Sequence, residues 1–200
     1  MQGILNGKTI MQKKIIITGF GGQGVIMAGR IVGAAAALGD KLESSLVQSY
    51  GPESRGGACS VQVTIADGQI YYPYINVPDI LVCMSQAGYD KYKDIIDDDT
   101  VLVTDQDLVR MSGNRDYYTV PATRFAEEMG LKMMANIIMI GFLTGVTEAV
   151  TLESAKDTVS KSVPPKTVEI NLKAFDRGWE FARATLKSRR KKAAGNIGVV

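Results

Sequence analysis

The sequence predicts an α/β protein with a Rossmann-like, mainly parallel sheet, an inserted β-hairpin and a C-terminal helical layer. Three observations lead to this fold class. Short β-branched runs alternate with helical segments in the first half of the chain, which is typical of a parallel sheet. One segment in that half has the period-two alternation of a hairpin. Beyond Pro121 the chain has only helical periodicity, so the second half is expected to cover the sheet.

The first strand and helix are predicted from the sequence KKIIITGFGGQGVIMAGRIVGAAAALG. A β-branched run ends at Gly19 and predicts a buried strand. An alanine-rich run from Val25 follows and ends at Gly39, which is the pattern of a helix with a glycine stop. A second strand is expected over residues 42–48.

The middle of the chain predicts a hairpin and two further strands. The segment ACSVQVTIADGQIYYPYI, from Ala58 to Ile75, alternates and contains the turn signal Asp67-Gly68, so its two arms are expected to pair. PDILVCMSQ and TVLVTD are apolar runs typical of buried strands, and a helix is expected between them over residues 89–96.

Four helices are expected after Pro121. Two are separated near Gly130, a third covers TLESAKDTVSKSV and stops at Pro164-Pro165, and the last carries one apolar stripe. That stripe consists of Leu172, Phe175, Trp179, Ala182 and Leu186. We therefore divide the chain into an N-terminal extension (1–13), one domain (14–190) and a flexible tail (191–200).

The composition excludes several function classes. The formal charge is only +2 over 200 residues, so the chain as a whole has no nucleic-acid footprint. The longest apolar run, residues 133–146, is too short to span a membrane. No secretory signal is recognisable, so we expect a cytoplasmic protein.

Histidine is absent and there are two cysteines, Cys59 and Cys83. Two thiolates without histidine cannot complete a zinc site or hold an iron–sulfur cluster in one chain, so no metal site is expected. Both cysteines lie in apolar runs, which favours buried free thiols over a disulfide. The missing histidine also removes the usual proton-transfer side chain, and no catalytic residue is predicted.

The sequence GFGGQG fits the G-x-G-x-x-G pattern through Gly19, Gly21 and Gly24, with a strand before it and a helix after it. Gly22 adds a fourth glycine and Gln23 an amide at the rim. Glycines let the backbone approach a ligand, and the helix N-terminus favours an anion. The motif alone is compatible with a dinucleotide, with another phosphate or carboxylate, or with a purely structural turn.

A dinucleotide site requires an acidic residue at the end of the second strand to hold the ribose. Glu43 has about the right sequence spacing, but it lies at the start of that strand, and Gln48-Ser49-Tyr50 occupies the end. A lysine at the P-loop position is also missing, which argues against a nucleoside triphosphatase.

A second loop, YGPESRGG, follows this strand. Gly51-Pro52 makes a rigid turn and Gly56-Gly57 restores freedom, with Glu53, Ser54 and Arg55 between them. An arginine on a stiff loop suits phosphate or carboxylate recognition, although an Arg55–Glu53 ion pair is the alternative. Both loops, with Ser85-Gln86, are expected to border one crevice at the carboxyl ends of the strands.

GFGGQG followed by SYGPESRGGACSVQV resembles the gamma subunit of 2-oxoacid:ferredoxin oxidoreductases, most closely the 2-oxoglutarate type. The resemblance continues through PDILVCMSQ, MMANIIMIGFLTG and NLKAFDRG, and so covers residues 14–178. Pyruvate-type members resemble the first motif but differ in the second loop.

The resemblance implies a Rossmann-like subunit that is inactive alone. The complete enzyme of this family oxidatively decarboxylates a 2-oxoacid, transfers the acyl group to coenzyme A and reduces ferredoxin. Thiamine diphosphate lies between the alpha and beta subunits, and iron–sulfur clusters are held by other subunits or domains. Alpha, beta and delta subunits are thus the implied partners, with ferredoxin an indirect one.

The expected role of this chain is to form the coenzyme A side of the active-site cleft. The residues expected there are Gly19, Gly21, Gly22, Gln23, Gly24, Tyr50, Gly51, Pro52, Glu53, Ser54, Arg55, Gly56 and Gly57. The alternatives are a pyruvate-type or branched-chain-type gamma subunit, a free-standing NAD or flavin protein, and a module used only for docking.

The remaining motifs are expected to be structural. Asn136, inside an apolar helix, is predicted to bond to a nearby loop or helix. Gly141 and Gly145 are predicted to let that helix pack closely against a neighbour. The cations of KSRRKK are typical of a solvated helix end. The more specific alternative is that they contact an acidic partner subunit.

Overall fold

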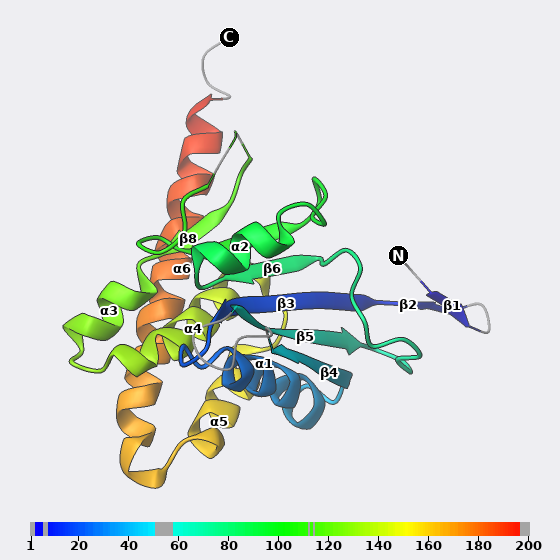
Figure 1. Cartoon of the computed structure of the whole chain (residues 1–200), viewed down its shortest axis with the longest axis horizontal. Helices are drawn as coiled ribbons and strands as arrows, with labels where there is room; N and C mark the ends of the chain where they lie inside the picture. The colour runs from blue at the N-terminus through cyan, green and yellow to red at the C-terminus, as the bar shows by residue number, and fades with distance from the viewer. Residues whose placement is uncertain (1–2, 6–7, 51–57, 112, 114, 197–200) are drawn as a thin grey trace.

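The structure is a computed structural model that describes residues 3–5, 8–50, 58–111, 113 and 115–196. Its centre is a six-stranded sheet in the order β4-β5-β3-β6-β7-β8, flanked by helices (Figure 1). The strands are β3 (Gln12–Phe20), β4 (Glu43–Tyr50), β5 (Ala58–Ala66), β6 (Ile80–Cys83), β7 (Val101–Asp105) and β8 (Tyr118–Val120).

Strands β3, β6, β7 and β8 form a parallel series, while β5 pairs antiparallel with both β3 and β4. Five of the six strands therefore run in the same direction. The sequence of β3 accounts for its central position. Ile15, Ile16 and Ile17 are all buried, so β3 has apolar side chains on both faces of the sheet. The expected α/β fold with a mainly parallel sheet is confirmed.

The inserted hairpin exists, but it is formed by β4 and β5, whose register pairs Glu43 with Ala66 and Tyr50 with Cys59. The expected hairpin across Asp67-Gly68 is wrong, because residues 67–79 contain no strand. The reason is that β3 and β4 already occupy both edges of β5. The returning segment is held instead by a hydrogen bond from the Ile75 N–H to Gln62 Oε1 at 2.7 Å.

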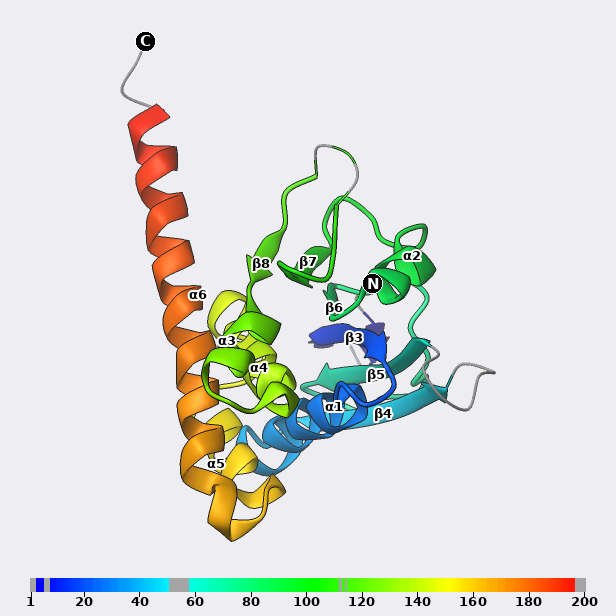
Figure 2. The same ribbon diagram turned by 60° about the vertical axis from the view of Figure 1, so that its left-hand side comes forward.

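The helices divide between the two faces of the sheet (Figure 2). α2 packs through Tyr89 and Tyr92 on one face, and the other helices pack on the opposite face, with α4 between α6 and the sheet. The α-helices are α1 (Val25–Ala34), α2 (Gln86–Tyr92), α3 (Ala122–Glu128), α4 (Ala135–Thr147), α5 (Leu152–Ser162) and α6 (Val168–Asn196). Short helical segments lie at η1 (Ala35–Gly39), η2 (Lys132–Met134) and η3 (Pro165–Thr167).

α4 and α6 cross at very short range because glycines face each other there. A Cβ atom built on Gly141 would lie 2.0 Å from the Phe175 carbonyl oxygen, and one on Gly178 would lie 2.0 Å from the Ile138 carbonyl oxygen. At Gly145 a Cβ would lie 2.5 Å from Ala182 Cβ. The predicted close packing of the Gly141–Gly145 helix is confirmed, and its neighbour is α6.

Several element boundaries differ from the sequence prediction. Strand β8 was not expected, and α2 begins at Gln86 because Ser85 caps it, accepting a hydrogen bond from the Gly88 N–H. The last helix continues to Asn196, so it includes the first six residues of the segment expected to be a tail. Within the first 13 residues, β1 (Gly3–Leu5) and β2 (Lys8–Ile10) pair as a small hairpin. None of the described helices is long and apolar enough to cross a membrane.

Candidate functional site

The glycine-rich turn connects the carboxyl end of β3 to α1, as the sequence predicts. Gly22 and Gly24 have φ angles of +95° and +72°, a region that side-chain-bearing residues rarely adopt. Gly19 is required for a different reason. A Cβ there would lie 2.5 Å from Gln23 Oε1 and 2.9 Å from Val25 Cγ2.

The Gln23 side chain fixes the shape of this turn. Its Oε1 accepts a hydrogen bond from the Phe20 N–H at 2.6 Å, and its Nε2 donates to the Met84 carbonyl oxygen at 2.9 Å. The first bond closes the turn on itself, and the second ties it to the residue after β6. Both sides of the amide are thus bound to backbone in this structure.

Asn136 supports the same turn from α4. Its Nδ2 donates to the Gly24 carbonyl oxygen at 3.3 Å, across 112 residues of sequence, and the residue is only 2% exposed. A Cβ on Gly24 would lie 2.3 Å from this nitrogen. The prediction that Asn136 bonds to a nearby loop is confirmed.

The turn lies at the switch point of the sheet. From β3 the chain passes to α1 on one face, and from the adjacent parallel β6 it passes to α2 on the other face. In open α/β sheets, ligands bind outside the carboxyl ends of such strands. The predicted neighbours Ser85 and Gln86 do follow β6 at this edge.

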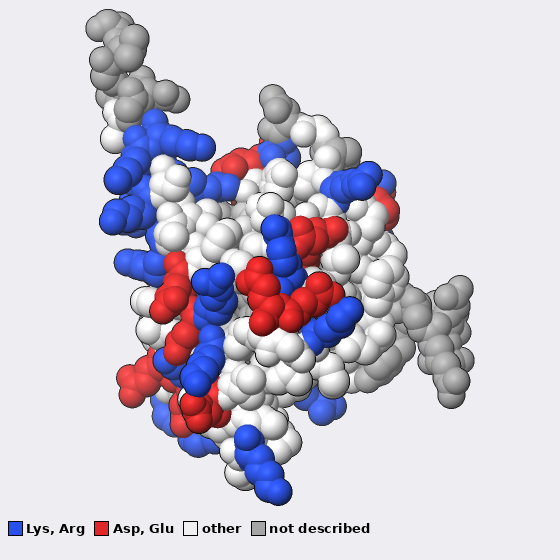
Figure 3. Space-filling view, turned by 90° about the vertical axis from the view of Figure 1, so that its left-hand side faces the viewer, with Lys and Arg blue, Asp and Glu red and all other residues white. Residues whose placement is uncertain are grey.

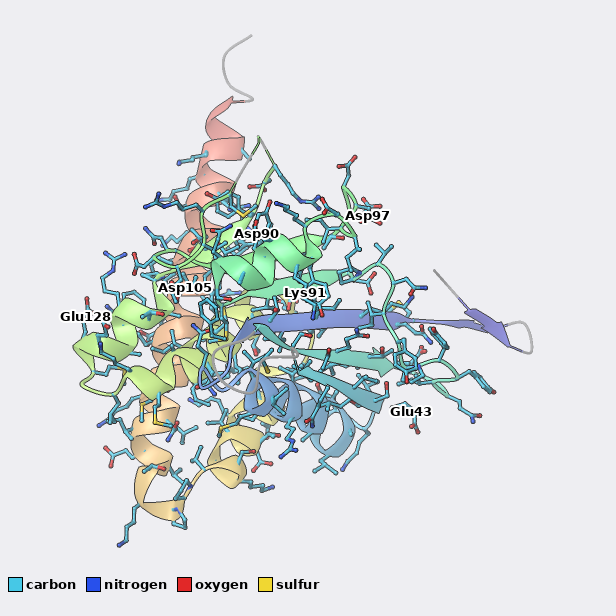
Figure 4. All side chains as sticks on the ribbon, viewed as in Figure 1. Glu43, Asp90, Lys91, Asp97, Asp105 and Glu128 are labelled. Atoms are coloured by element: carbon cyan, nitrogen blue, oxygen red, sulfur yellow. The ribbon has the colours of Figure 1, made fainter. Side chains whose placement is uncertain are left out.

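Ser85 and Gln86 have structural partners. Ser85 is fully buried and caps α2, while Gln86 Oε1 accepts a hydrogen bond from the Arg110 N–H at 2.8 Å. Sequence reasoning did not single out Asp105, which ends β7 at the same edge and is 1% exposed (Figure 4). Its Oδ2 accepts from the N–H and the hydroxyl of Thr123, at 2.9 and 2.8 Å. In the sequence, the signal for this residue is its place at the end of the run TVLVTD.

At the carboxyl end of β3, the groups available to bind a ligand are backbone N–H groups. No side chain among the described residues caps the N-terminus of α1, and the residue before it is Gly24 in a left-handed conformation. Because the first N–H groups of a helix lack helical acceptors and carry its positive dipole end, the turn is suited to an anion such as a phosphate.

The second predicted loop lies mostly outside the described residues. Gly51, Pro52, Glu53, Ser54, Arg55, Gly56 and Gly57 are not described, and Tyr50 is described only as the last residue of β4. The flanks of the loop are described. Tyr50 pairs with Cys59, and Cys59 pairs with Gly19, so both ends of the loop start from the sheet edge that carries the glycine turn.

Glu43, the acidic residue considered for a dinucleotide site, lies at the opposite ends of the strands from the glycine turn. It is the first residue of β4 and pairs with Ala66, which pairs with Gln12 at the start of β3 (Figure 4). In addition, β5 separates β4 from β3, whereas a dinucleotide fold places the two strands side by side. The geometry therefore does not support the NAD alternative.

The two cysteines lie on opposite faces of the sheet. Cys59 belongs to the core beneath α1 and Cys83 to the core beneath α2, and both are free thiols. Burial raises the pKa of both, and at Cys59 the Lys91 ammonium partly opposes this effect. Among the residues that the structure describes, no group of three or more His, Cys, Asp or Glu side chains is arranged to hold a metal ion.

A cavity of about 410 Å³ lies at the opposite edge of the sheet, lined mainly by apolar atoms of residues including Leu42, Ile65 and Val150. Asp40 on its wall accepts hydrogen bonds from the Thr151 N–H and from the Ser154 hydroxyl, at 2.9 and 2.6 Å. Burial alone would raise the pKa of Asp40, but these hydrogen bonds and a further one from the Thr151 hydroxyl outweigh it, and the pKa is lowered. Asp40 thus anchors the start of α5.

Comparisons with known proteins agree with this architecture. The family model of pyruvate ferredoxin/flavodoxin oxidoreductase matches residues 14–181. The 2-oxoglutarate synthase subunit KorC of Methanocaldococcus jannaschii is 48% identical over 178 residues, which cover 86% of this chain and 95% of that protein.

Two solved structures have the same fold. The gamma subunit of a keto/oxoacid ferredoxin oxidoreductase from Geobacter sulfurreducens is 36% identical, with a TM-score of 0.78 over 87% of this chain and 98% of that one. The 2-oxoglutarate:ferredoxin oxidoreductase from Magnetococcus marinus, solved with 2-oxoglutarate, coenzyme A and succinyl-CoA bound, is 25% identical with a TM-score of 0.76. The match covers 86% of this chain but 31% of that longer one. By sequence and by fold, this chain belongs to the pyruvate ferredoxin/flavodoxin oxidoreductase family, as its two glycine loops predict.

Proposed function

We propose that this chain is the gamma subunit of a cytoplasmic 2-oxoglutarate:ferredoxin oxidoreductase that also contains alpha, beta and delta subunits. The complex oxidatively decarboxylates 2-oxoglutarate, transfers the succinyl group to coenzyme A and passes two electrons to ferredoxin. Support comes from the 48% identity to a 2-oxoglutarate synthase subunit that is matched over 95% of its length.

In this proposal the chemistry takes place on other subunits. The sequence has no histidine, and two buried thiols on opposite faces of the sheet do not fit an iron–sulfur cluster. The sequence also has no G-D-G motif for thiamine diphosphate. Thiamine diphosphate and the clusters are therefore assigned to the partner subunits, and this chain contributes binding groups.

The carboxyl edge of β3 is proposed as the coenzyme A side of the cleft. The observation that carries this assignment is the uncapped N-terminus of α1, which follows two left-handed glycines at the switch point of the sheet. Coenzyme A carries phosphates, and backbone N–H groups at a helix N-terminus bind phosphate without a charged side chain. A related enzyme has been solved with coenzyme A bound.

Within this site the residues divide into two roles. Gly19, Gly21, Gly22 and Gly24 let the backbone approach a phosphate, and Gln23 holds the turn through its bonds to Phe20 and Met84. Residues 50–57 supply the second wall, with the guanidinium of Arg55 as the second phosphate ligand.

The Arg55→Ala variant of the complete complex tests this assignment. A charge-assisted hydrogen bond contributes about 1.5–3 kcal/mol, so the KM for coenzyme A should rise roughly tenfold or more. The KM for 2-oxoglutarate and the thiamine diphosphate content should stay unchanged. Steady-state kinetics with each substrate varied in turn separates these effects.

Arg30→Ala provides the matched control, because Arg30 is an exposed arginine on α1 without an ion pair in the described part of the chain. The control should have the kinetics of the wild type. If Arg55→Ala assembles normally and keeps the wild-type KM for coenzyme A, Arg55 does not bind coenzyme A. If the wild-type chain fails to copurify with oxidoreductase subunits, the subunit assignment itself is wrong.

A further inference from the structure

The charges of this chain are distributed very unevenly. Six of its 23 Lys and Arg residues follow Glu180, and none of its 21 Asp and Glu residues does. Residues 1–180 therefore carry a formal charge of −4, while the last 20 residues carry +6. The six cations are Arg183, Lys187, Arg189, Arg190, Lys191 and Lys192.

All six lie on the C-terminal half of α6, which extends beyond the sheet (Figures 1 and 2). Figure 3 shows Lys and Arg side chains gathered along this part of the helix. The helix dipole favours cations only within the last turn, and these residues begin more than three turns before Asn196. Stabilisation of the helix end therefore accounts for only some of them.

The contacts of Arg189 show which side of α6 packs against the rest of the protein. Arg189 Nη1 forms an ion pair with Asp116 at 2.6 Å, its Nη2 donates to the Tyr117 carbonyl oxygen, and its guanidinium lies 4.0 Å from the centre of the Tyr118 ring. Arg189 thus fastens α6 to β8 and to the segment before it. Within the described residues it is the only one of the six that forms an ion pair.

Four of the other cations lie together on a different side of α6. Residues 183, 187, 190, 191 and 194 follow helical spacing, so they lie on one stripe of α6. Arg183, Lys187, Arg190 and Lys191 are exposed, and together with Leu186 and two alanines they line a shallow groove of about 580 Å³. We call this surface the basic stripe.

We propose that the basic stripe docks an acidic surface of a partner subunit in the same oxidoreductase complex. This inference rests on the proposed function, which supplies partner subunits. Charge complementarity is the first argument, because four cations on one side, none of them with an ion pair among the described residues, attract a surface of the opposite sign and steer its approach. Ala184, Leu186 and Ala194 beside these cations add apolar contact, which suits a folded protein surface.

Two observations favour a protein partner over a nucleic acid. Residues 183–194 include no aromatic side chain, and the Arg183 guanidinium lies over the nearby Trp179 ring, 5.8 Å from its centre, so none of the stripe's own residues can stack on a base of a single-stranded nucleic acid. The stripe also lies after residue 181, where the match to the family model ends. It therefore lies outside the part of the chain that matches the family model.

The test uses the double variant Lys187→Glu/Lys191→Glu, whose two exposed positions are one turn apart on the stripe. The measurement is the affinity of the chain for the purified assembly of the other subunits, at about 0.05 M and about 0.5 M salt. At low salt the variant should bind at least about tenfold more weakly than the wild type, and the difference should shrink at high salt.

Arg30→Glu/Lys166→Glu is the matched control, since it makes the same change in net charge at two exposed positions outside the stripe. It should keep the wild-type affinity. Thermal melting checks that both variants fold, and Lys187→Gln/Lys191→Gln repeats the test with charge removed instead of reversed, with a smaller loss expected.

Three outcomes overturn the proposal. The first is equal affinity of the Lys187→Glu/Lys191→Glu variant and the wild type for the other subunits. The second is unchanged subunit binding together with loss of binding to a labelled single-stranded oligonucleotide, which would make the stripe a nucleic-acid site. The third is loss only of self-association in sedimentation. Failure of the wild-type chain itself to bind the other subunits would instead contradict the proposed function.

Discussion

Gly22 and Gly24 both have positive φ angles, but their surroundings differ. Among the residues that the structure describes, nothing lies within 4 Å of a Cβ built on Gly22, whereas a Cβ on Gly24 would meet Asn136 Nδ2 at 2.3 Å. Within the described part of the chain, the first glycine is therefore needed for its backbone conformation. The second is needed for its conformation and for the contact between α1 and α4.

Alanine at each position separates these two requirements. Gly22→Ala should lower the free energy of unfolding by about 1–2 kcal/mol, the cost of a left-handed conformation for a residue with a Cβ. Gly24→Ala should lower it further, by about 1–3 kcal/mol more, because the Asn136 amide must move. Urea denaturation of the purified chain measures both values.

The double variant Gly24→Ala/Asn136→Ala is the control. Because the shorter side chain makes room for the new Cβ, its loss of stability should be smaller than the sum of the two single losses. Equal losses for Gly22→Ala and Gly24→Ala, or strict additivity in the double variant, would show that the Asn136 contact does not constrain Gly24.

For single residues, the sequence predicts which positions form the glycine turn but not which hydrogen bonds hold it. The G-x-G-x-x-G spacing correctly places the turn between a strand and a helix, since those are local requirements. The bond from Asn136 to Gly24 spans 112 residues, and the bond from Gln23 to Met84 spans 61. Such partners depend on how α4 and β6 are placed, which local patterns do not specify. Residues 51–57 lie outside the described residues, so the predicted role of Arg55 stays a prediction.

At the scale of the elements, α4 and α6 cross at very short range. Gly178 lies in the interior of α6, where alanine is intrinsically better than glycine by about 1 kcal/mol. A Cβ there would nevertheless lie 2.0 Å from the Ile138 carbonyl oxygen and 2.9 Å from the Phe142 nitrogen. Backbone atoms of a packed helix cannot move aside as a flexible side chain can.

Gly178→Ala therefore tests whether packing outweighs helix propensity. We expect the free energy of unfolding to fall by about 1–3 kcal/mol, as for other overpacked cores. Ser188→Ala, at an exposed position of the same helix, should leave it unchanged or slightly higher. Urea denaturation of the isolated chain is the measurement, and a stabilised Gly178→Ala variant would contradict the close crossing.

The predicted elements were correct where the signal was long or local. β3, α1 and the four helices after Pro121 have strong periodicity or clear glycine and proline boundaries. The hairpin was assigned to the wrong pair of arms, because strand pairing depends on which sheet edges remain free. β8 has only three residues and was missed, since so short a run has no measurable period.

At the scale of the whole molecule, the proposed function separates binding from chemistry. The proposed anion site lies at the carboxyl end of β3, the basic stripe lies on the projecting end of α6, and the two thiols are buried in two separate cores. Burial raises the pKa of Cys59 and Cys83, so both remain neutral thiols near pH 7 and are poor nucleophiles or metal ligands.

The isolated chain should consequently be inactive. Purified alone, it is expected to show no 2-oxoglutarate- and coenzyme A-dependent reduction of an artificial electron acceptor, and to contain neither iron nor a nicotinamide or flavin. Adding the other subunits should restore turnover, because in the proposed function the groups that react with the 2-oxoacid come from them and this chain completes the coenzyme A side. An anaerobic assay with metal and cofactor analysis measures both parts. Turnover by the chain alone, or a tightly bound flavin or nicotinamide, would mean that the glycine turn serves a redox cofactor, and the division between binding and chemistry would then be wrong.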